Sequence, residues 1–183
     1  MSGRDAILRT DRLTLRRWRG TDRAAIHDLN RDPAVMATVG PVMTRAESDA
    51  FMNRIEAHFD EHGYGLWCVD LDRESIGFVG LSHPWWRDGV EVGWRLRSAW
   101  WGHGYATEAA RAALAVGFER AGLDSIISFT AATNERSQAV MRRIGLERVA
   151  DADFDHPSVP DGSPLRPHVL YQLDAATWRA RAA

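Results

Sequence analysis

Residues 90–107 read VEVGWRLRSAWWGHGYAT and contain the two features that decide the fold. Polar and apolar residues alternate along 90–97, which is typical of a strand with one buried face. Two glycines, Gly102 and Gly104, then separate this strand from a predicted helix over 105–121. A strand, a glycine turn and a helix in this order direct several backbone N–H groups, and the positive end of a helix dipole, towards one point. The stretch is therefore a candidate anion site, to which the Thr107 hydroxyl could add one donor.

Two other interpretations of the glycine turn remain open. A Gly-x-Gly between a strand and a helix also serves as a tight connection that binds nothing. A dinucleotide site is the second alternative, because Asp124 lies about 20 residues further on, where such sites place a ribose-binding acid. Against it, Thr107 stands in place of the third glycine, and the strand alternates where a central parallel strand would be apolar throughout.

Working outward from this stretch, the sequence predicts a mixed α/β fold in a single domain spanning residues 1–183. Upstream we expect strands at 7–10 and 12–18, a helix from Thr21–Asp22 to Pro33, a helix between the capping box Thr44/Glu47 and Gly63, and an antiparallel meander of strands at 65–71, 74–82 and 90–97. Downstream we expect a strand at 125–131, a helix at 135–144, a strand near 146–150, a long polar loop over 151–167 and a strand at 168–173.

The bulk composition narrows the class of protein and its partners. The net charge of −2 gives no global attraction for nucleic acid or for an acidic membrane surface. No apolar run approaches the roughly 18 residues of a membrane span, and the first residues do not resemble a signal peptide, so we expect a cytoplasmic protein. The basic residues are all arginine, so anion binding must rely on arginine, histidine and backbone N–H groups. Cys68 is the single cysteine and is read as a core residue.

Residues 58–62, His-Phe-Asp-Glu-His, match the H-x-x-E-H pattern of one class of zinc proteases. They fall at the predicted end of a helix beside Gly63, with Phe59 in the apolar stripe. The sequence offers no evident third ligand. We therefore interpret the pattern as a helix terminus at the surface and predict no metal.

Four segments taken together resemble the GNAT superfamily of N-acetyltransferases, in particular the branch of the ribosomal-protein alanine N-acetyltransferases. They are LRTDRLTLRRW (8–18), VEVGWRL (90–96), WWGHGYATEAARAAL (100–114) and NERSQAVMRRIGL (134–146), in family order over nearly the whole chain. Two positions depart from the family pattern. Ala99 stands where the family has Gln or Arg, and Arg143-Ile144-Gly145-Leu146 replaces the usual lysine-glycine-phenylalanine ending of the last helix while retaining its charge and shape.

The resemblance implies that acetyl-CoA is the acetyl donor and lies where two central parallel strands part. The strand Trp94, Arg95, Leu96 and Arg97 would pair its backbone with the pantetheine arm. The loop residues Gly102, His103, Gly104, Tyr105 and Ala106, followed by Thr107, would hold the pyrophosphate. Asn134 would bond the pantetheine, and Ser137 would lie near the thioester sulfur.

Direct acetyl transfer from a thioester to an amine needs a base for the ammonium, donors for the oxyanion and an acid for the leaving thiolate. Glu91 is our first candidate base, since the family frequently has a glutamate here. His83 is the second, because histidine titrates in the right range. A backbone N–H of the strand 94–96 would meet the oxyanion, and Ser137 would be the acid.

The acceptor is expected to be a small-molecule amine or a peptide N-terminus. Asp153 and Asp155 in the long loop, with Trp85 and Trp86, would form an acidic, aromatic-lined mouth that prefers a cationic acceptor. A non-catalytic acyl-CoA-binding module is the alternative function. Homodimers are common in this family and are a further expectation.

Overall fold

The structure of the protein is a computed structural model that describes residues 7–182. The described strands form one nine-stranded sheet in which most neighbours are antiparallel, so the predicted mixed α/β class is confirmed. Its strands, in spatial order, are β1 (Leu8–Arg9), β2 (Thr14–Arg16), β3 (Leu66–Leu71), β4 (Glu74–Ser82), β5 (Glu91–Leu96), β6 (Ser125–Ala131), β9 (Pro167–Asp174) and β7 (Glu147–Arg148), and β8 (Phe154–Asp155) pairs with β9.

The predicted meander is present as β3, β4 and β5, which pair antiparallel in chain order. Asp72 and Arg73 make the first turn with φ values of 50° and 72°, the left-handed conformation of a tight hairpin. β5 and β6 are the parallel pair at the centre of the sheet. The glycine turn and the helix that follows it form the crossover between them, as a parallel connection requires.

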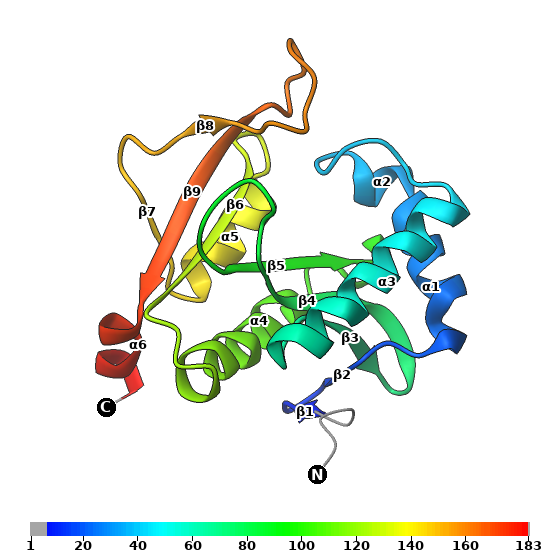
Figure 1. Cartoon of the computed structure of the whole chain (residues 1–183), viewed down its shortest axis with the longest axis horizontal. Helices are drawn as coiled ribbons and strands as arrows, with labels where there is room; N and C mark the ends of the chain where they lie inside the picture. The colour runs from blue at the N-terminus through cyan, green and yellow to red at the C-terminus, as the bar shows by residue number, and fades with distance from the viewer. Residues whose placement is uncertain (1–6, 183) are drawn as a thin grey trace.

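Helices cover both faces of the sheet (Figure 1). They are α1 (Arg23–Arg31), α2 (Pro33–Met36), α3 (Arg45–His62), α4 (Tyr105–Ala115), α5 (Glu135–Arg143) and α6 (Ala175–Ala182). The alternation along β4 decides which side chains meet which helix. Phe78 packs on Phe51 of α3, with ring centroids 5.6 Å apart, whereas Leu81 lies on the opposite face against the π-helical turn Val116–Arg120 that continues α4.

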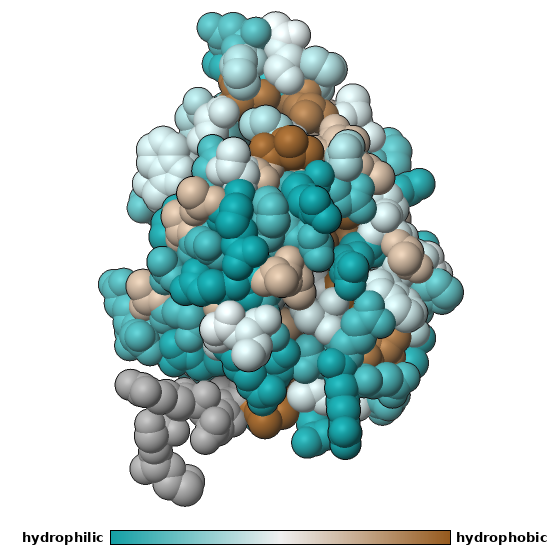
Figure 2. Space-filling model, turned by 90° about the vertical axis from the view of Figure 1, so that its right-hand side faces the viewer, coloured by the Kyte–Doolittle hydropathy of each residue, from teal (hydrophilic) through white to brown (hydrophobic). Residues whose placement is uncertain are grey.

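Figure 2 shows the side of the molecule formed by α1, α2 and α3, on which hydrophilic residues predominate and hydrophobic ones gather in small groups. Val39 and Val42, between α2 and α3, are among the exposed large hydrophobic residues. The core lies between the helices and the sheet and includes, fully buried, Leu15, Ile26, Trp67, Ile76, Leu114, Ile126 and Met141. Cys68 is also fully buried, which confirms its assignment to the core. No helix of the described part of the chain is long and apolar enough to cross a membrane.

The structure corrects several predicted boundaries. Pro33 starts a new helix instead of only ending one, because Asp32 caps α2 by accepting a hydrogen bond from Ala34 N at 2.8 Å and proline is favoured in a first helical turn. The loop 151–167 is not entirely irregular, since Phe154 pairs with His168 in β8. Helix α6 was not expected.

Candidate functional site

The parallel strands β5 and β6 touch at one end and then separate. Ile127 N donates to Val90 O at 2.9 Å, and Glu91 is in register with Ile127. One residue further, the buried Ser128 hydroxyl donates to Val92 O at 2.8 Å and takes the place of a strand-to-strand bond. In the described chain, no backbone hydrogen bond joins 93–96 to β6, so this edge of β5 is left for a ligand. An extended pantetheine arm with its amide groups fits such an edge.

The glycine turn supplies an anion site at the far end of this edge. Gly102 and Gly104 have φ values of 82° and 83°, which other residues rarely adopt. Gly104 is the N-cap of α4 and offers no side chain to cap the helix. The N–H groups of the first helical turn therefore point outward beside the positive end of the helix dipole, as in phosphate-binding helix termini. These residues fit the pyrophosphate of coenzyme A.

Arg12, between β1 and β2, contacts the glycine turn, and the sequence alone did not indicate this contact. Its guanidinium donates to His103 O at 3.0 Å, pairs with Glu108 at 2.6 Å and lies 4.5 Å from the centre of the Tyr105 ring. It therefore holds the glycine turn in place, while Glu108 balances its charge. Arg12 and Glu108 are 96 positions apart in the sequence, so only the tertiary fold reveals that they pair.

A cavity of about 310 Å³ lies between the α2–α3 side of the molecule and the β6, β8 and β9 side. Its wall combines strand residues Phe78, Ser82, Glu91, Gly93, Trp94 and Arg95 with Thr38, Val39, Phe51, Leu66, Ser128, Phe129, Thr130, Asn134, Ser137, Met141, His156 and His168. A larger open hollow of about 710 Å³ beside β1 and β2 is lined mainly by arginines, with Asp70 and Asp72, and by no residue of β5 or β6.

Glu91 lies in the cavity wall at the point where β5 and β6 part. It is opposite Ser82 of β4 in the sheet register. Burial disfavours the charged carboxylate and raises the pKa of Glu91 to about 8. A side chain at Gly93 would come within 3.6 Å of the Glu91 carboxylate, so the glycine keeps the approach to that carboxylate open. A carboxyl group that titrates near neutral pH is suited to general-base catalysis.

Arg95 faces the same side of β5 as Glu91. Its guanidinium donates to Asn30 Oδ1 at 2.6 Å and lies 5.2 Å from the Phe78 ring and 5.7 Å from the Phe51 ring. Burial lowers the pKa of Arg95 to about 10, and among the described residues no carboxylate pairs with it. Its unused donors make the cavity attractive to a negative group.

Asn134 and Ser137 form a connected pair at the start of α5. Asn134 Oδ1 accepts from Ser137 N at 3.2 Å and caps the helix, while Asn134 Nδ2 lies within 3.1 Å of the hydroxyl oxygens of Thr38, Thr130 and Ser137. Because Ser137 Oγ accepts a hydrogen bond from Asn134, its own proton is free to point into the cavity. The amide protons of Asn134 are already engaged, so its spare capacity towards pantetheine is a lone pair of Oδ1.

The remaining predicted residues lie around the cavity, outside its wall. His83 lies at the end of β4, and its side chain is largely exposed. Partial loss of solvent around the ring, followed by the neighbouring His62, lowers the pKa of His83. Trp85 is 81% exposed, and Trp86 packs on Phe129 with ring centroids 5.3 Å apart. Asp153 pairs with Arg148 at 2.5 Å and Asp155 with Arg166 at 3.2 Å, so arginines neutralise the two expected acidic groups.

A splayed parallel strand pair, an uncapped helix N-terminus with a glycine turn, and the half-buried carboxyl of Glu91 fit an acyltransferase that takes its acyl group from a coenzyme A thioester. Comparison with known proteins gives the same class. The family profile described as "Acetyltransferase (GNAT) domain" matches residues 12–147. The chain belongs to the GNAT acetyltransferases, and it is an acyltransferase that uses acetyl-CoA.

Individual relatives support this membership. FsC-acetyl coenzyme A-N(2)-transacetylase of Aspergillus fumigatus is 28% identical over 161 residues, covering 82% of this chain and 68% of the relative. The crystal structure of an acetyltransferase from Agrobacterium tumefaciens str. C58 is 30% identical, covers 91% of this chain and 93% of its own, and superposes with a TM-score of 0.76. RimL, a ribosomal L7/L12 alpha-N-protein acetyltransferase in complex with coenzyme A, has a TM-score of 0.76 at 17% identity, over 93% of this chain and 99% of its own, and supports the fold alone.

Proposed function

We propose that the protein transfers the acetyl group of acetyl-CoA to a primary amine by direct attack on the thioester, with Glu91 as the base. The observation that carries this proposal is the half-buried Glu91 carboxyl, with a pKa of about 8, in the wall of the cavity where β5 and β6 part. His83, the other candidate base, lies outside the cavity wall and contacts His58 and His62 instead.

The chain supplies a group for each proton transfer. Glu91, directly or through a water molecule, takes a proton from the ammonium so that the amine nitrogen can form a bond to the acetyl carbon. The free N–H groups on the open edge of β5, within 94–96, are the donors for the oxyanion. The carbon–sulfur bond then breaks, and the Ser137 hydroxyl gives its proton to the leaving sulfur. Ser137 regains a proton from the nitrogen of the tetrahedral intermediate, directly or through water, which leaves the neutral amide and the free thiol. No nucleophile of the enzyme is needed, in agreement with the burial of Cys68.

The charges of the cavity favour an acceptor amine that also carries a negative group. Arg95 contributes an unpaired guanidinium, and Glu91 is the one acidic residue among those that line the cavity. A polyamine would need several carboxylates there. Four residues along a strand span about 13 Å, so the amine at Glu91 and the anion at Arg95 are several bonds apart. A peptide N-terminus followed by an acidic side chain meets this requirement better than a free amino acid does.

A screen of amine acceptors tests both parts of the proposal by following thiol release from acetyl-CoA and the product masses. The panel contains polyamines, aminoglycosides, amino acids, and peptide pairs that differ only by glutamate or glutamine at the third position. We expect turnover with peptides, and kcat/KM at least about tenfold higher for the acidic member of a pair. No thiol release with any amine, although acetyl-CoA binds, would instead support the non-catalytic acyl-CoA-binding module.

The variant Arg95→Met separates the acceptor preference from the chemistry. Methionine keeps the apolar stem of Arg95, and the lost hydrogen bond to the buried Asn30 Oδ1 should cost about 1–3 kcal/mol of stability. We expect the preference for the acidic peptide to disappear while the KM for acetyl-CoA is kept. A preference that survives in Arg95→Met would contradict the role of Arg95 and leave the acetyl transfer itself untouched.

A further inference from the structure

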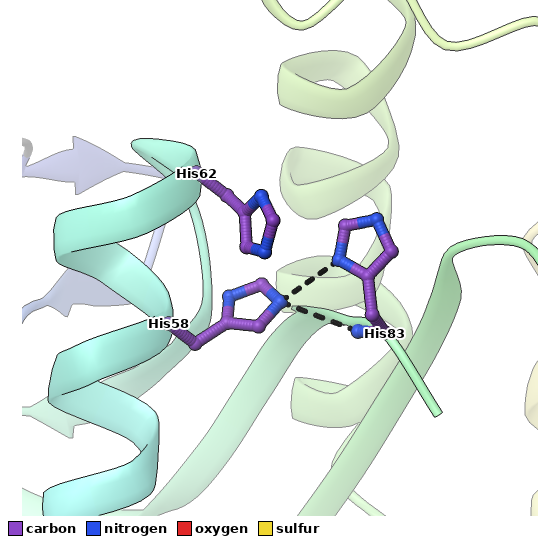
Figure 3. Close-up of side chains that lie close together, drawn as sticks. All are labelled: His58, His62 and His83. Carbon is purple, nitrogen blue, oxygen red and sulfur yellow. Dashed lines mark hydrogen bonds between the residues drawn. The ribbon is translucent and has the colours of Figure 1, made fainter. Parts of the chain in front are cut away.

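Three histidines meet on the surface between α3 and the end of β4 (Figure 3). His58 and His62 are four residues apart on α3 and so lie on one face of the helix. His83 follows the last residue of β4, and its ring centroid is 5.3 Å from that of His58 and 4.3 Å from that of His62. One nitrogen of each ring lies within 4.8 Å of the others. The fold thus supplies the third ligand that the H-x-x-E-H pattern lacks in the sequence.

The hydrogen bonds of His58 fix which of its nitrogens carries the proton. Nδ1 is 2.9 Å from Tyr64 O, and because a carbonyl oxygen only accepts, Nδ1 carries the proton. Nε2 accepts from the backbone N–H of His83 at 3.2 Å, so this nitrogen is unprotonated, and a bound metal would replace that hydrogen bond. A histidine whose Nδ1–H is held by a backbone carbonyl while Nε2 points at a common centre has the orientation typical of a metal ligand.

The spacing of the nitrogens suits a small cation. His58 Nε2 and His83 Nδ1 are 3.1 Å apart. Two nitrogens that bind zinc tetrahedrally at about 2.0–2.1 Å are separated by about 3.3 Å. His62 completes the triangle from the adjacent helical turn, and the Glu61 carboxylate, 3.7 Å from His62 Nε2, adds negative charge beside it.

We propose that His58, His62 and His83 bind one divalent transition-metal ion of the zinc class, with water in the remaining position. Imidazole nitrogens prefer zinc and its neighbours in the first transition row to magnesium or calcium. The ion would tie the C-terminal end of α3 to the end of β4. Both elements border the acceptor cavity, through Phe51 and Ser82, so the ion would stiffen that wall. The inference does not depend on the acetyl acceptor.

Metal titration of the full-length protein, free of any affinity tag, tests this site. Isothermal titration with Zn²⁺ and the visible spectrum of bound Co²⁺ give stoichiometry and geometry without reference to acetyl transfer. We expect one equivalent of either ion, a tetrahedral Co²⁺ spectrum and a higher Tm in the presence of Zn²⁺.

Variants on two different elements assign the binding to the cluster. His62→Gln on α3 and His83→Gln after β4 should each weaken Zn²⁺ binding at least about tenfold. His27→Gln on α1 removes a half-buried histidine away from the cluster and should leave the affinity unchanged. Circular dichroism of each variant without metal shows that it is folded. Absence of saturable binding in the wild type, or equal affinity in all variants, would overturn the proposal.

Discussion

Glu91 of β5 is in register with Ile127 of β6 at the one pairing position that joins these parallel strands in the described chain. The carboxyl side chain therefore sits where the sheet begins to open. Beyond it, β5 keeps its partner β4 on one edge, from Gly93 opposite Gly80 to Leu96 opposite Gly77, and has a free edge on the other. In the proposed mechanism, one strand thus presents the base, the oxyanion donors and the backbone edge for the acetyl donor.

Glu91→Gln should lower kcat/KM by about 10²- to 10⁴-fold, the usual contribution of a general base. Since the pKa of Glu91 is raised to about 8, its ionised fraction, and with it the wild-type rate, should rise tenfold per pH unit below 8 and level off above. The variant should lose this rise. An acceptor whose amine has a low pKa keeps the titration of the amine out of the measured range.

The same substitution should change the pH dependence of stability. The folded-state pKa of Glu91 lies above its unfolded value of 4.5, so the folded state binds the extra proton and loses stability as the pH rises from 4.5 through 8. The Tm of Glu91→Gln relative to wild type should therefore be higher at pH 9 than at pH 5. Glu74→Gln, an exposed glutamate on β4, is the control and should show no such trend. A flat pH–rate profile in the wild type would remove Glu91 from the mechanism.

Ser137→Ala should reduce kcat by about tenfold or more, with little change in the KM for acetyl-CoA. The helix cap is preserved, because it uses Ser137 N and not the hydroxyl. The loss should be largest for the donor thiol that leaves least readily, which acyl donors with a series of thiols can measure. Normal turnover in this variant would mean that the leaving sulfur finds its proton elsewhere.

Local signals in the sequence were sufficient for most of the fold. The capping box is formed, with Thr44 Oγ1 accepting from Glu47 N, and Gly63 ends α3 with φ of 75°. Alternation along 90–97 correctly predicted a strand with one buried face, and Glu91 and Arg95, four residues apart, share a face of it. What that face meets could not be predicted, because Asn30 and Phe51 come from helices more than 40 residues away in the sequence.

Long-range contacts account for the rest of what the sequence did not reveal. Arg12 reaches the glycine turn across 91 positions, and His58 meets His83 across 25. The acidic mouth expected from Asp153 and Asp155 rested on their spacing in a loop, which says nothing about Arg148 and Arg166 beside them. Local sequence patterns predict turns and the buried face of a helix or strand. Ion pairs between separate elements depend on the complete fold and cannot be predicted in this way.

The double variant Asp153→Asn/Asp155→Asn tests whether these aspartates select a cationic acceptor, as the sequence suggested, or have no part in acceptor binding, as the cavity geometry suggests. Both aspartates pair with arginines and lie outside the cavity wall, so we expect the acceptor KM to change by less than about twofold. Exposed ion pairs contribute up to about 1 kcal/mol each, so the loss of stability should be small. A clear rise of KM for cationic acceptors alone would restore the acidic mouth as the selecting element.

Gly102→Ala tests the anion site against a matched control elsewhere in the chain. A methyl group on Gly102 or on Gly122 meets nothing within 4 Å, and both residues have positive φ, 82° and 67°. Each alanine should therefore cost a similar free energy of unfolding, about 1–2 kcal/mol, from backbone strain alone. Of the two, only Gly102 belongs to the turn proposed to bind the pyrophosphate, whereas Gly122 lies beyond the other end of the helix, about 25 Å away at 1.5 Å per residue. We expect the KM for acetyl-CoA to rise about tenfold in Gly102→Ala and to stay unchanged in Gly122→Ala. Equal effects of the two substitutions on KM would show that the turn is only a connection, the alternative that the sequence left open.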